Sequence, residues 1–367
     1  MAGAVWRASL AAVVALAIGL TAAEGTSLRT NRAKALVPLE EIVPGGPPPD
    51  GIPAIDRPAF VSPATAATWL RPREPVLALR INDDARAYPL QVLIWHEIVN
   101  DTVGGVPVMI TFCPLCNSGL AFERTVDGAT LDFGTSGMLY KSDLVMYDRQ
   151  THSLWSQMDG RAIVGDRTGA RLLGRTANTI AFEDWRAAHP AGKVLSRDTG
   201  YSRNYGVNPY ETYDEPTLRP FLFQGRPDGR RPPKERVVGL RIGETRRAYP
   251  WPLLEKHRVV HDAPAGEPIV VFYQPGMLSA LDQTEIARSR AVGATAVYSA
   301  RLHGRTLAFE AISGGFRDRR TGSAWSLFGV ATAGPLAGKR LTPLQHVDAF
   351  WFAWAAFNPT TTIWTGP

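Results

Sequence analysis

The sequence predicts a β-rich protein, between all-β and α+β in class, made of two tandem, diverged copies of one antiparallel β domain with one or two short helices each. Two observations predict this. Short β-branched apolar runs, such as residues 107–112 and 267–273, are bounded by Gly, Pro and Asp, as strands are. Blocks of residues in the first half also recur in the same order in the second half, which indicates an internal repeat.

The N-terminus has the pattern of a secretory signal peptide. Arg7 precedes an apolar run from Leu10 to Leu20, and small residues follow at 21–23. This run is shorter than the roughly 20 residues of a transmembrane helix. We expect residues 1–23 to be removed, which leaves an exported, periplasmic or extracellular protein with no transmembrane span and with unknown partners.

The charge of the chain does not indicate nucleic-acid binding. The net charge is +6 and the pI is about 9.4, but the basic residues are not clustered as they are in nucleic-acid-binding proteins. The densest basic stretch, residues 226–236, is interrupted by Pro and Gly and is typical of a solvated linker. We therefore expect no nucleic-acid partner.

Residues 24–63 form a Pro/Gly-rich lead-in. Pro44 and the cluster Pro47–Pro49 lie within it, separated by two glycines. Proline lacks a backbone donor and glycine does not hold one conformation, so we expect neither strands nor helices there.

The repeat defines the remaining domain boundaries. Val76–Ile81 and Arg86–Pro89 recur as Val237–Ile242 and Arg247–Pro250. Later, an Asp-Arg-x-Thr segment with a following Trp-Ser pair occurs at residues 148–156 and again at 318–326. These matches predict a first repeat at 64–195, a Tyr-rich inter-repeat segment with the basic linker at 196–236, and a second, degenerate repeat at 237–367. Short helices are expected within 90–99, 182–188 and 350–357.

The Tyr-rich run between the repeats has two interpretations. It is either an ordered inter-domain loop held by aromatic packing or a lid or wall over a functional site. Its composition favours the packed loop.

Differences between the copies indicate which one is functional. Cys113 and Cys116 stand opposite Gln274 and Met277, so the second copy has no thiols. The first copy also has a longer segment between residues 133 and 148, and its His152 is matched by a glycine. The first copy is therefore predicted to carry the site, and the second to cover or support it.

The Cys-x-x-Cys pair is compatible with three functions. The thiols can bind zinc with His96, His152 or a carboxylate as a further ligand, or copper(I) with His96 or a thioether such as Met138 or Met146. His96 is repeated as His257, however, and so also suits a structural role. They can exchange disulfides, but such motifs usually precede a helix, whereas residues 119–123 predict a strand. They can also be a structural pair in a binding module without chemistry.

Several motifs of the first half resemble those of the bacterial domain-of-unknown-function family 3179. They are Trp95–Asp101, Thr111–Ser118, Phe133–Thr151 with Leu154–Gln157, and Ser196–Tyr201 with Asn208–Tyr210. The family name offers no reaction. The resemblance implies that one constellation contains His96, Cys113, Cys116, Asn117, Tyr140, Ser142 and Asp143.

The leading hypothesis is an exported metal-binding protein with Cys113, Cys116 and His96 as the ligands of copper or zinc. The alternatives are a periplasmic thiol–disulfide redox protein, with Cys113 and Cys116 as the catalytic candidates, and a non-catalytic binding module. Whether the protein is an enzyme stays open, and no dinucleotide fingerprint or phosphate loop is present. The supporting residues are Asn117, Ser118, Met138, Tyr140, Ser142, Asp143 and His152.

Overall fold

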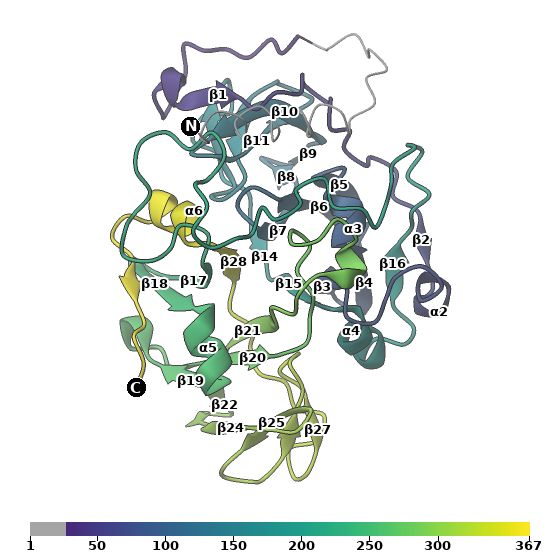
Figure 1. Ribbon diagram of the computed structural model, residues 1–367, viewed down its shortest axis with the longest axis vertical. Coiled ribbons are helices and arrows are strands. Elements are labelled where there is room, and N and C mark those ends of the chain that lie inside the picture. The colour runs from purple at the N-terminus through teal and green to yellow at the C-terminus, as the bar shows by residue number, and fades with distance from the viewer. Residues whose placement is uncertain (1–26) are drawn as a thin grey trace, which may run out of the picture.

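The structure, a computed structural model, describes residues 27–367, so the predicted signal peptide at 1–23 lies outside the described residues. The β-rich class is confirmed, because several antiparallel sheets and only a few short helices make up the fold (Figure 1). Within the described part of the chain, no helix is both long and apolar enough to cross a membrane.

The first half of the chain builds three sheets. The sheets have the strand orders β15-β3-β4-β16-β2, β14-β7-β6-β5 and β1-β10-β11-β12-β13. Except for the parallel pair β4 and β16, neighbouring strands are antiparallel. The principal strands are β3 (Pro75–Ile81), β4 (Asp84–Pro89), β5 (Ile98–Val103), β6 (Val106–Cys113), β7 (Ser118–Glu123), β10 (Phe133–Tyr140), β11 (Asp143–Asp148), β12 (Leu154–Ser156), β13 (Arg161–Val164), β14 (Gly174–Arg175), β15 (Asn178–Ala181) and β16 (Lys193–Leu195).

The second half has much of the same order of paired strands, but its sheets contain no counterparts of β1, β2 and β14 among the described residues. Its central hairpin has a partner antiparallel to its first strand and one parallel to its second strand, as in the first half. This correspondence supports the proposal that residues 64–195 and 237–367 are diverged copies. The strands are β17 (Arg236–Ile242), β18 (Thr245–Pro250), β19 (Val259–Asp262), β20 (Ile269–Gln274), β21 (Ala294–Ser299), β24 (Phe309–Ile312), β25 (Gly315–Asp318), β26 (Ala324–Trp325), β27 (Ala331–Ala333), β28 (His346–Phe350) and β29 (Thr362–Ile363).

One buried aspartate network has the same geometry in both halves. The Asp148 carboxylate accepts hydrogen bonds from the Thr151 backbone N–H at 2.7 Å and from Trp155 Nε1 at 2.9 Å. Asp318 accepts the corresponding bonds from Thr321 at 2.7 Å and from Trp325 at 3.1 Å. The shared Asp-x-x-Thr and Trp residues are therefore architectural.

The helices are short and differ in one place from the expectation. Helix α4 (Phe182–Ala188) has the predicted bounds, and α6 (Trp351–Phe357) starts one residue later than predicted. The prediction over 90–99 was too long, since α3 spans only Leu90–Leu93. The chain then turns through Glu97, whose φ of 57° ends any helix, and enters β5. The other α-helices are α2 (Pro63–Ala66) and α5 (Trp251–His257).

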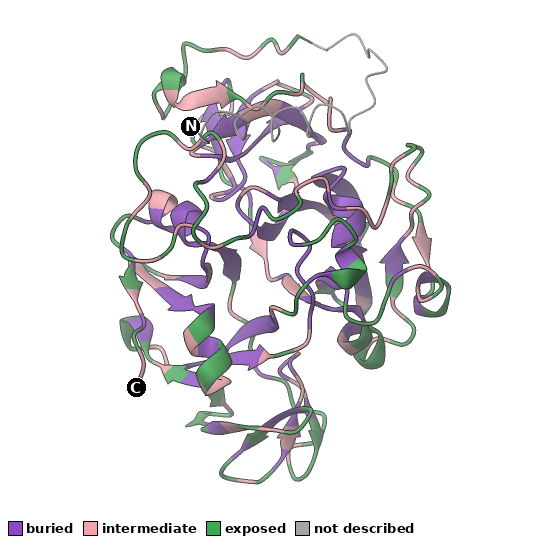
Figure 2. Cartoon of the chain, viewed as in Figure 1, coloured by how far each residue is buried: buried purple, intermediate pink, exposed green. Residues whose placement is uncertain are grey.

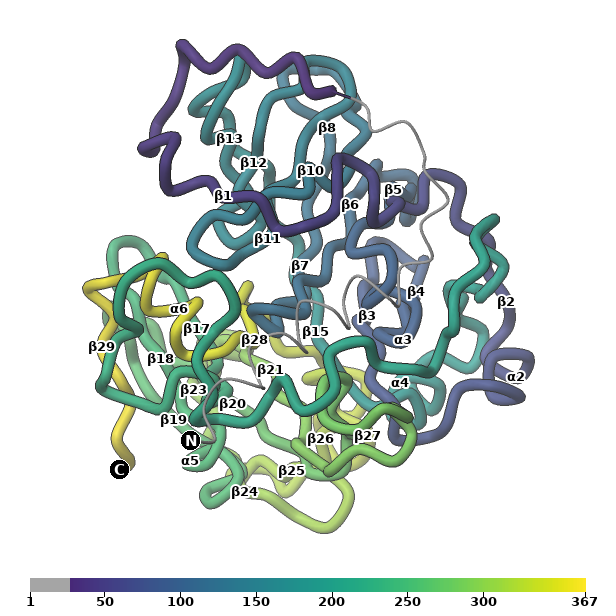
Figure 3. The backbone as a smooth tube through the Cα atoms, turned by 45° about the horizontal axis from the view of Figure 1, so that its top comes forward, coloured from purple at the N-terminus to yellow at the C-terminus, as the bar shows by residue number. Residues whose placement is uncertain are grey.

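The expectation that the lead-in has no regular structure was wrong. A 3₁₀ turn at Leu39–Glu41 precedes β1 (Ile42–Pro44), which pairs with β10 (Figure 3), and β2 (Phe60–Val61) pairs with β16. Both are edge strands, which form hydrogen bonds on one side only and so tolerate prolines. The Pro/Gly-rich composition limits the length of these strands without preventing them.

The two halves share their hydrophobic cores. One core cluster joins buried residues of the first half, including Phe112 and Cys116, to Phe350 and Trp354 of the second half. Figure 2 shows buried segments throughout both halves. The two halves are therefore in contact along β7 and β28, which lie side by side.

The basic linker at residues 226–236 was expected to be solvated, but part of it is buried. Lys234 is buried. Its Nζ donates to the Tyr213 carbonyl at 2.7 Å and lies 3.3 Å from the centre of the Tyr213 ring. Burial lowers the pKa of Lys234 to about 8. Lys234 thus fixes the linker against the Tyr-rich segment.

Candidate metal centre

The cysteines lie in the turn that joins β6 to β7. Cys113 is the last residue of β6 and pairs with Ser118, the first residue of β7. The four residues between them form the turn, which Asn117 closes with a φ of 52° and a backbone bond to the Pro114 carbonyl at 3.2 Å. Because two strands flank the motif, the predicted strand after Cys116 is confirmed.

Asp143 approaches the thiols from the neighbouring sheet. It begins β11 directly after a two-residue hairpin loop, in which Lys141 and Ser142 have φ values of 54° and 65°. Two consecutive non-glycine residues with positive φ are a strained arrangement. The loop places the Ser142 carbonyl 3.4 Å from Cys116 Sγ, which donates to it.

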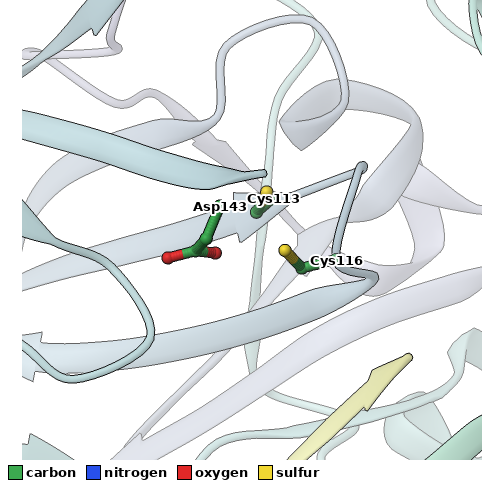
Figure 4. Close-up of side chains that lie close together, drawn as sticks. All are labelled: Cys113, Cys116 and Asp143. Carbon is green, nitrogen blue, oxygen red and sulfur yellow. The ribbon is translucent and has the colours of Figure 1, made fainter. Parts of the chain in front are cut away.

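The sulfur atoms of Cys113 and Cys116 and a carboxylate oxygen of Asp143 all lie within 4.8 Å of one another (Figure 4). All three residues are buried, with exposures of 2%, 0% and 1%. Asp143 Oδ2 accepts a hydrogen bond from the Met158 backbone at 3.0 Å, whereas Oδ1 is buried and has no partner of hydrogen-bond geometry among residues 27–367. An unpaired buried carboxylate oxygen beside two thiols is chemically suited to a cation.

Burial dominates the electrostatics of the three groups. Desolvation raises the pKa of Asp143 to about 7, although the Met158 amide and the thiols lower it in part. Burial also raises the pKa of Cys113 and Cys116 above the ordinary thiol value. Without a cation, the groups therefore favour their neutral forms.

Glu97 is a further buried acid close to this centre. Its backbone accepts a hydrogen bond from Phe112 at 2.9 Å, next to Cys113. Burial, and secondarily the charge of Asp143, raises the pKa of Glu97 to about 8. The equivalent residue in the second half is Arg258, which has nearly the same backbone conformation, with a φ of 64° against 57°. The acid is therefore specific to the first half.

A cavity of about 60 Å³ lies beside the centre. Glu97 and Leu115 line it from the first half, and Tyr210, Tyr213 and Phe221 line it from the inter-repeat segment. The segment is attached to the hairpin loop, since Ser142 Oγ donates to the Phe221 carbonyl at 2.5 Å. The inter-repeat segment is therefore both a packed loop and a wall of this cavity.

Gly137 shapes the same cavity from the lead-in side. It has a φ of 73° at a bulge in β10, and a Cβ there would lie 2.1 Å from the Pro47 carbonyl oxygen. Only glycine allows the lead-in to approach this closely. The lead-in thus forms one side of this cavity.

His96 is held away from the thiols. Its Nδ1 donates to the Pro53 carbonyl at 2.7 Å, and its Nε2 accepts from the Tyr205 hydroxyl at 2.7 Å. Among the described residues, the group that meets the metal-site distances contains Asp143 and does not include His96. The structure therefore places Asp143, rather than His96, where a third ligand is expected.

The other predicted site residues have identifiable local roles. Ser118 Oγ donates to Gln157 at 3.1 Å. Tyr140 packs against Phe357, and Met138 lines the cavity. Asn117 and Ser142 form the two turns already described. None of these side chains belongs to the group of three ligand atoms.

His152 lies outside the centre as well. Its Nδ1 accepts a hydrogen bond from the Arg29 backbone at 3.1 Å. It has a φ of 55°, and Gly322, its counterpart in the second half, has a φ of 72°. Both residues occupy a left-handed turn position, so the change from His152 to Gly322 between the halves is not evidence of function.

Sequence reasoning placed Asp143 among the supporting residues and did not identify Glu97 as part of the site. A signal for both was present. Glu97 stands opposite Arg258, and Asp143 lies in the hairpin extension that the second half lacks, since β24 and β25 turn at residues 313–314. Unmatched acids in the copy with the cysteines were therefore the informative residues.

Comparison with known proteins gives one match. The family model described as "Protein of unknown function (DUF3179)" matches residues 49–361. No curated protein and no solved structure matches the chain significantly.

Proposed function

The chain belongs to the DUF3179 family, whose description names no activity, and from the cysteine centre we propose a metal-binding protein that holds one ion through Cys113, Cys116 and Asp143. Zinc suits this donor set best, because Zn²⁺ accepts both thiolate and carboxylate ligands. Copper(I), which prefers soft thiolates, is the alternative ion. We also propose that the protein is exported, on the basis of the signal-peptide pattern in residues 1–23.

The observation that carries this proposal is the unpaired Oδ1 of Asp143. A buried carboxylate oxygen without a partner costs folding free energy, which a structure normally avoids. Here the oxygen belongs to a residue whose carboxylate lies within 4.8 Å of two sulfur atoms. A cation between the three groups would satisfy the oxygen and favour ionised thiols.

The comparison of the halves supports the same centre. The positions that correspond to Cys113, Cys116 and Glu97 hold Gln274, Met277 and Arg258, and the hairpin that carries Asp143 is shorter there. The shared architecture is retained while the donor atoms are lost. A purely structural cysteine pair would not require the buried acids to differ as well.

Three protein ligands are one fewer than in a closed structural zinc site. A bound ion would therefore retain a position for water or a small ligand, and it would supply Lewis acidity there. The chain's own contribution is to exclude bulk water, through Tyr210, Tyr213 and Phe221, and to fix the Asp143 carboxylate through the Met158 amide.

Thiol–disulfide exchange is the second candidate, and burial disfavours it. The attacking species is the thiolate, which must reach a partner disulfide. Cys113 and Cys116 are 2% and 0% exposed, and burial raises the pKa of both. The raised pKa also opposes metal binding, but a bound cation offsets it, because the cation stabilises the thiolates directly.

The test is the metal content of the purified full chain, measured by inductively coupled plasma mass spectrometry with a parallel count of free thiols. The wild type should contain zinc or copper near equimolar with the chain. Cys113→Ser and Asp143→Asn should lose it, whereas the matched variant His96→Gln should retain it. Equimolar metal in Cys113→Ser contradicts the proposal, and metal loss only in His96→Gln would replace Asp143 by His96 as the ligand. Absence of both metal and free thiols would indicate a disulfide.

A further inference from the structure

A second cavity lies between the two halves and is separate from the cysteine centre. Its volume is about 460 Å³, within the range of small-molecule sites. β3, β15 and α4 line it from the first half. Tyr298, Phe328, Arg340, Leu341 and Pro343 line it from the second half. β15 and β21, which carry the lining residues Asn178 and Tyr298, lie side by side (Figure 1). It has no lining residue in common with the cavity at the cysteines.

The charge of this cavity is entirely positive. Arg80, Arg175 and Arg340 line it, and no Asp or Glu of the described part of the chain does. Asp83 pairs with Arg80 and Glu123 pairs with Arg175, but Arg340 has no ion-pair partner among residues 27–367. Its guanidinium group is therefore available to an anionic ligand, for which a planar fork of donors is well suited.

An imidazole lines the cavity together with the arginines. His189 is half-buried, and burial lowers its pKa, with further lowering by the charges of Arg80 and Arg340. An acidic group bound in the cavity would be attracted by Arg80 and Arg340, which line it with His189.

Aromatic rings form the apolar part of the wall. The His189 ring lies 5.7 Å from that of Trp185 and 5.4 Å from that of Phe328, which comes from the second half. Rings that line a polar cavity commonly pack against the apolar face of a ligand. This surface suits a compact molecule with both an apolar face and an acidic group.

Two lining residues have buried atoms without partners. Asn178 Oδ1 can accept a hydrogen bond and Arg175 Nε can donate one, and neither has a partner within the described chain. Buried polar atoms are normally paired. Asn178 and Arg175 are themselves half-buried lining residues, so their polar side chains suit a ligand that carries hydroxyl groups.

We propose that this inter-half cavity binds an anionic monosaccharide, with Arg340 and Arg80 holding its acidic group and Phe328 packing on its ring. The acidic group is a carboxylate or a phosphate, since both suit a guanidinium. The proposal does not depend on metal binding at the cysteines. It also explains why residues of both halves converge on a cavity that neither half forms alone.

Isothermal titration calorimetry of the full chain at low salt tests this, with glucuronate and glucose 6-phosphate as probes and glucose as the neutral control. At least one anionic probe should bind 1:1 with a Kd of about 1 mM or tighter, and glucose should bind at least about tenfold more weakly. The anion that binds identifies the acidic group. Failure of both anions to bind, or equal binding of glucose, overturns the proposal.

Two variants locate the site. Arg340→Ala should weaken binding by about tenfold or more, and its exposed side chain makes loss of folding a poor explanation. Arg319→Ala is the matched control, because Arg319 is also exposed but pairs with Glu310 outside the cavity. Binding that is unchanged in Arg340→Ala, or equally weakened in Arg319→Ala, would contradict the assignment.

Discussion

The backbone N–H of Phe350 donates a hydrogen bond to the carbonyl of Cys116 at 2.8 Å. Phe350 ends β28 in the second half, and Cys116 lies in the turn that holds the candidate ligands. The second half thus supports the cysteine turn directly. This relationship explains how a copy without thiols contributes to the centre of the other.

Replacing the Phe350 side chain should destabilise the protein and weaken the centre. Phe350 is fully buried and packs against Tyr213. Phe350→Ala should lower the free energy of unfolding by about 3–5 kcal/mol, because truncation leaves a cavity. Urea denaturation measures this loss. The exposed Leu222 provides the control, since Leu222→Ala should change stability by about 0.5 kcal/mol or less. Equal stability of the two variants would contradict the supporting role.

The wall over the cavity should loosen when one hydroxyl is removed. The Tyr213 hydroxyl accepts a hydrogen bond from the Phe221 backbone at 3.2 Å. Tyr213→Phe should cost about 1 kcal/mol and speed hydrogen exchange at the Phe221 amide. Exchange mass spectrometry of the peptide around residue 221 detects the change, and the amides of β17 serve as the internal reference. Unaltered exchange at Phe221 would show that this bond does not hold the segment.

His96 should make stability depend on acid pH. Burial lowers the pKa of His96 from 6.5 to about 4, so the unfolded chain takes up a proton at a higher pH than the folded chain. Stability should therefore fall as the pH drops from 6.5 toward 4, by up to about 3 kcal/mol from this group.

The check is the difference between the wild type and His96→Gln in urea denaturation at pH 7 and pH 5. The wild type should lose more stability on acidification than the variant, which has no titrating ring. Parallel losses in the two proteins would contradict the assignment of His96 as a neutral, buried structural residue.

The two aspartate networks provide a matched pair of variants. Asp148→Asn and Asp318→Asn each weaken bonds to a backbone amide and an indole. Each should destabilise the protein by about 1–3 kcal/mol, as measured by thermal unfolding, and neither should remove metal. The contrary result is that Asp148→Asn loses metal while the two variants do not lose similar stability. That result would show that the first-half network serves the metal centre.

Much of the architecture was predictable because it depends on local patterns. Strands such as Val106–Cys113 and the helix at Phe182–Ala188 follow from short apolar runs and their boundaries. The cysteine centre was also located in the first half, since its thiols are unmatched in the second.

What could not be predicted depends on contacts between distant segments. His96 lies in the motif that precedes the cysteine motif in the sequence. Its ring nitrogens, however, form hydrogen bonds with Pro53 and with Tyr205, which is 109 residues away. Asp143 reaches the thiols only because a strained hairpin turns it inward. Lys234 is buried because the inter-repeat segment covers it, which composition alone does not indicate.

The most direct test of the central claim is X-ray absorption spectroscopy of the metal-loaded protein at the edge of the bound metal. For zinc, the account predicts two sulfur ligands at about 2.3 Å and oxygen ligands at about 2.0–2.2 Å, with the oxygen from Asp143 lost in Asp143→Asn. A spectrum without sulfur, or with the outer-shell scattering of an imidazole, would contradict the claim that Cys113, Cys116 and Asp143 hold the ion.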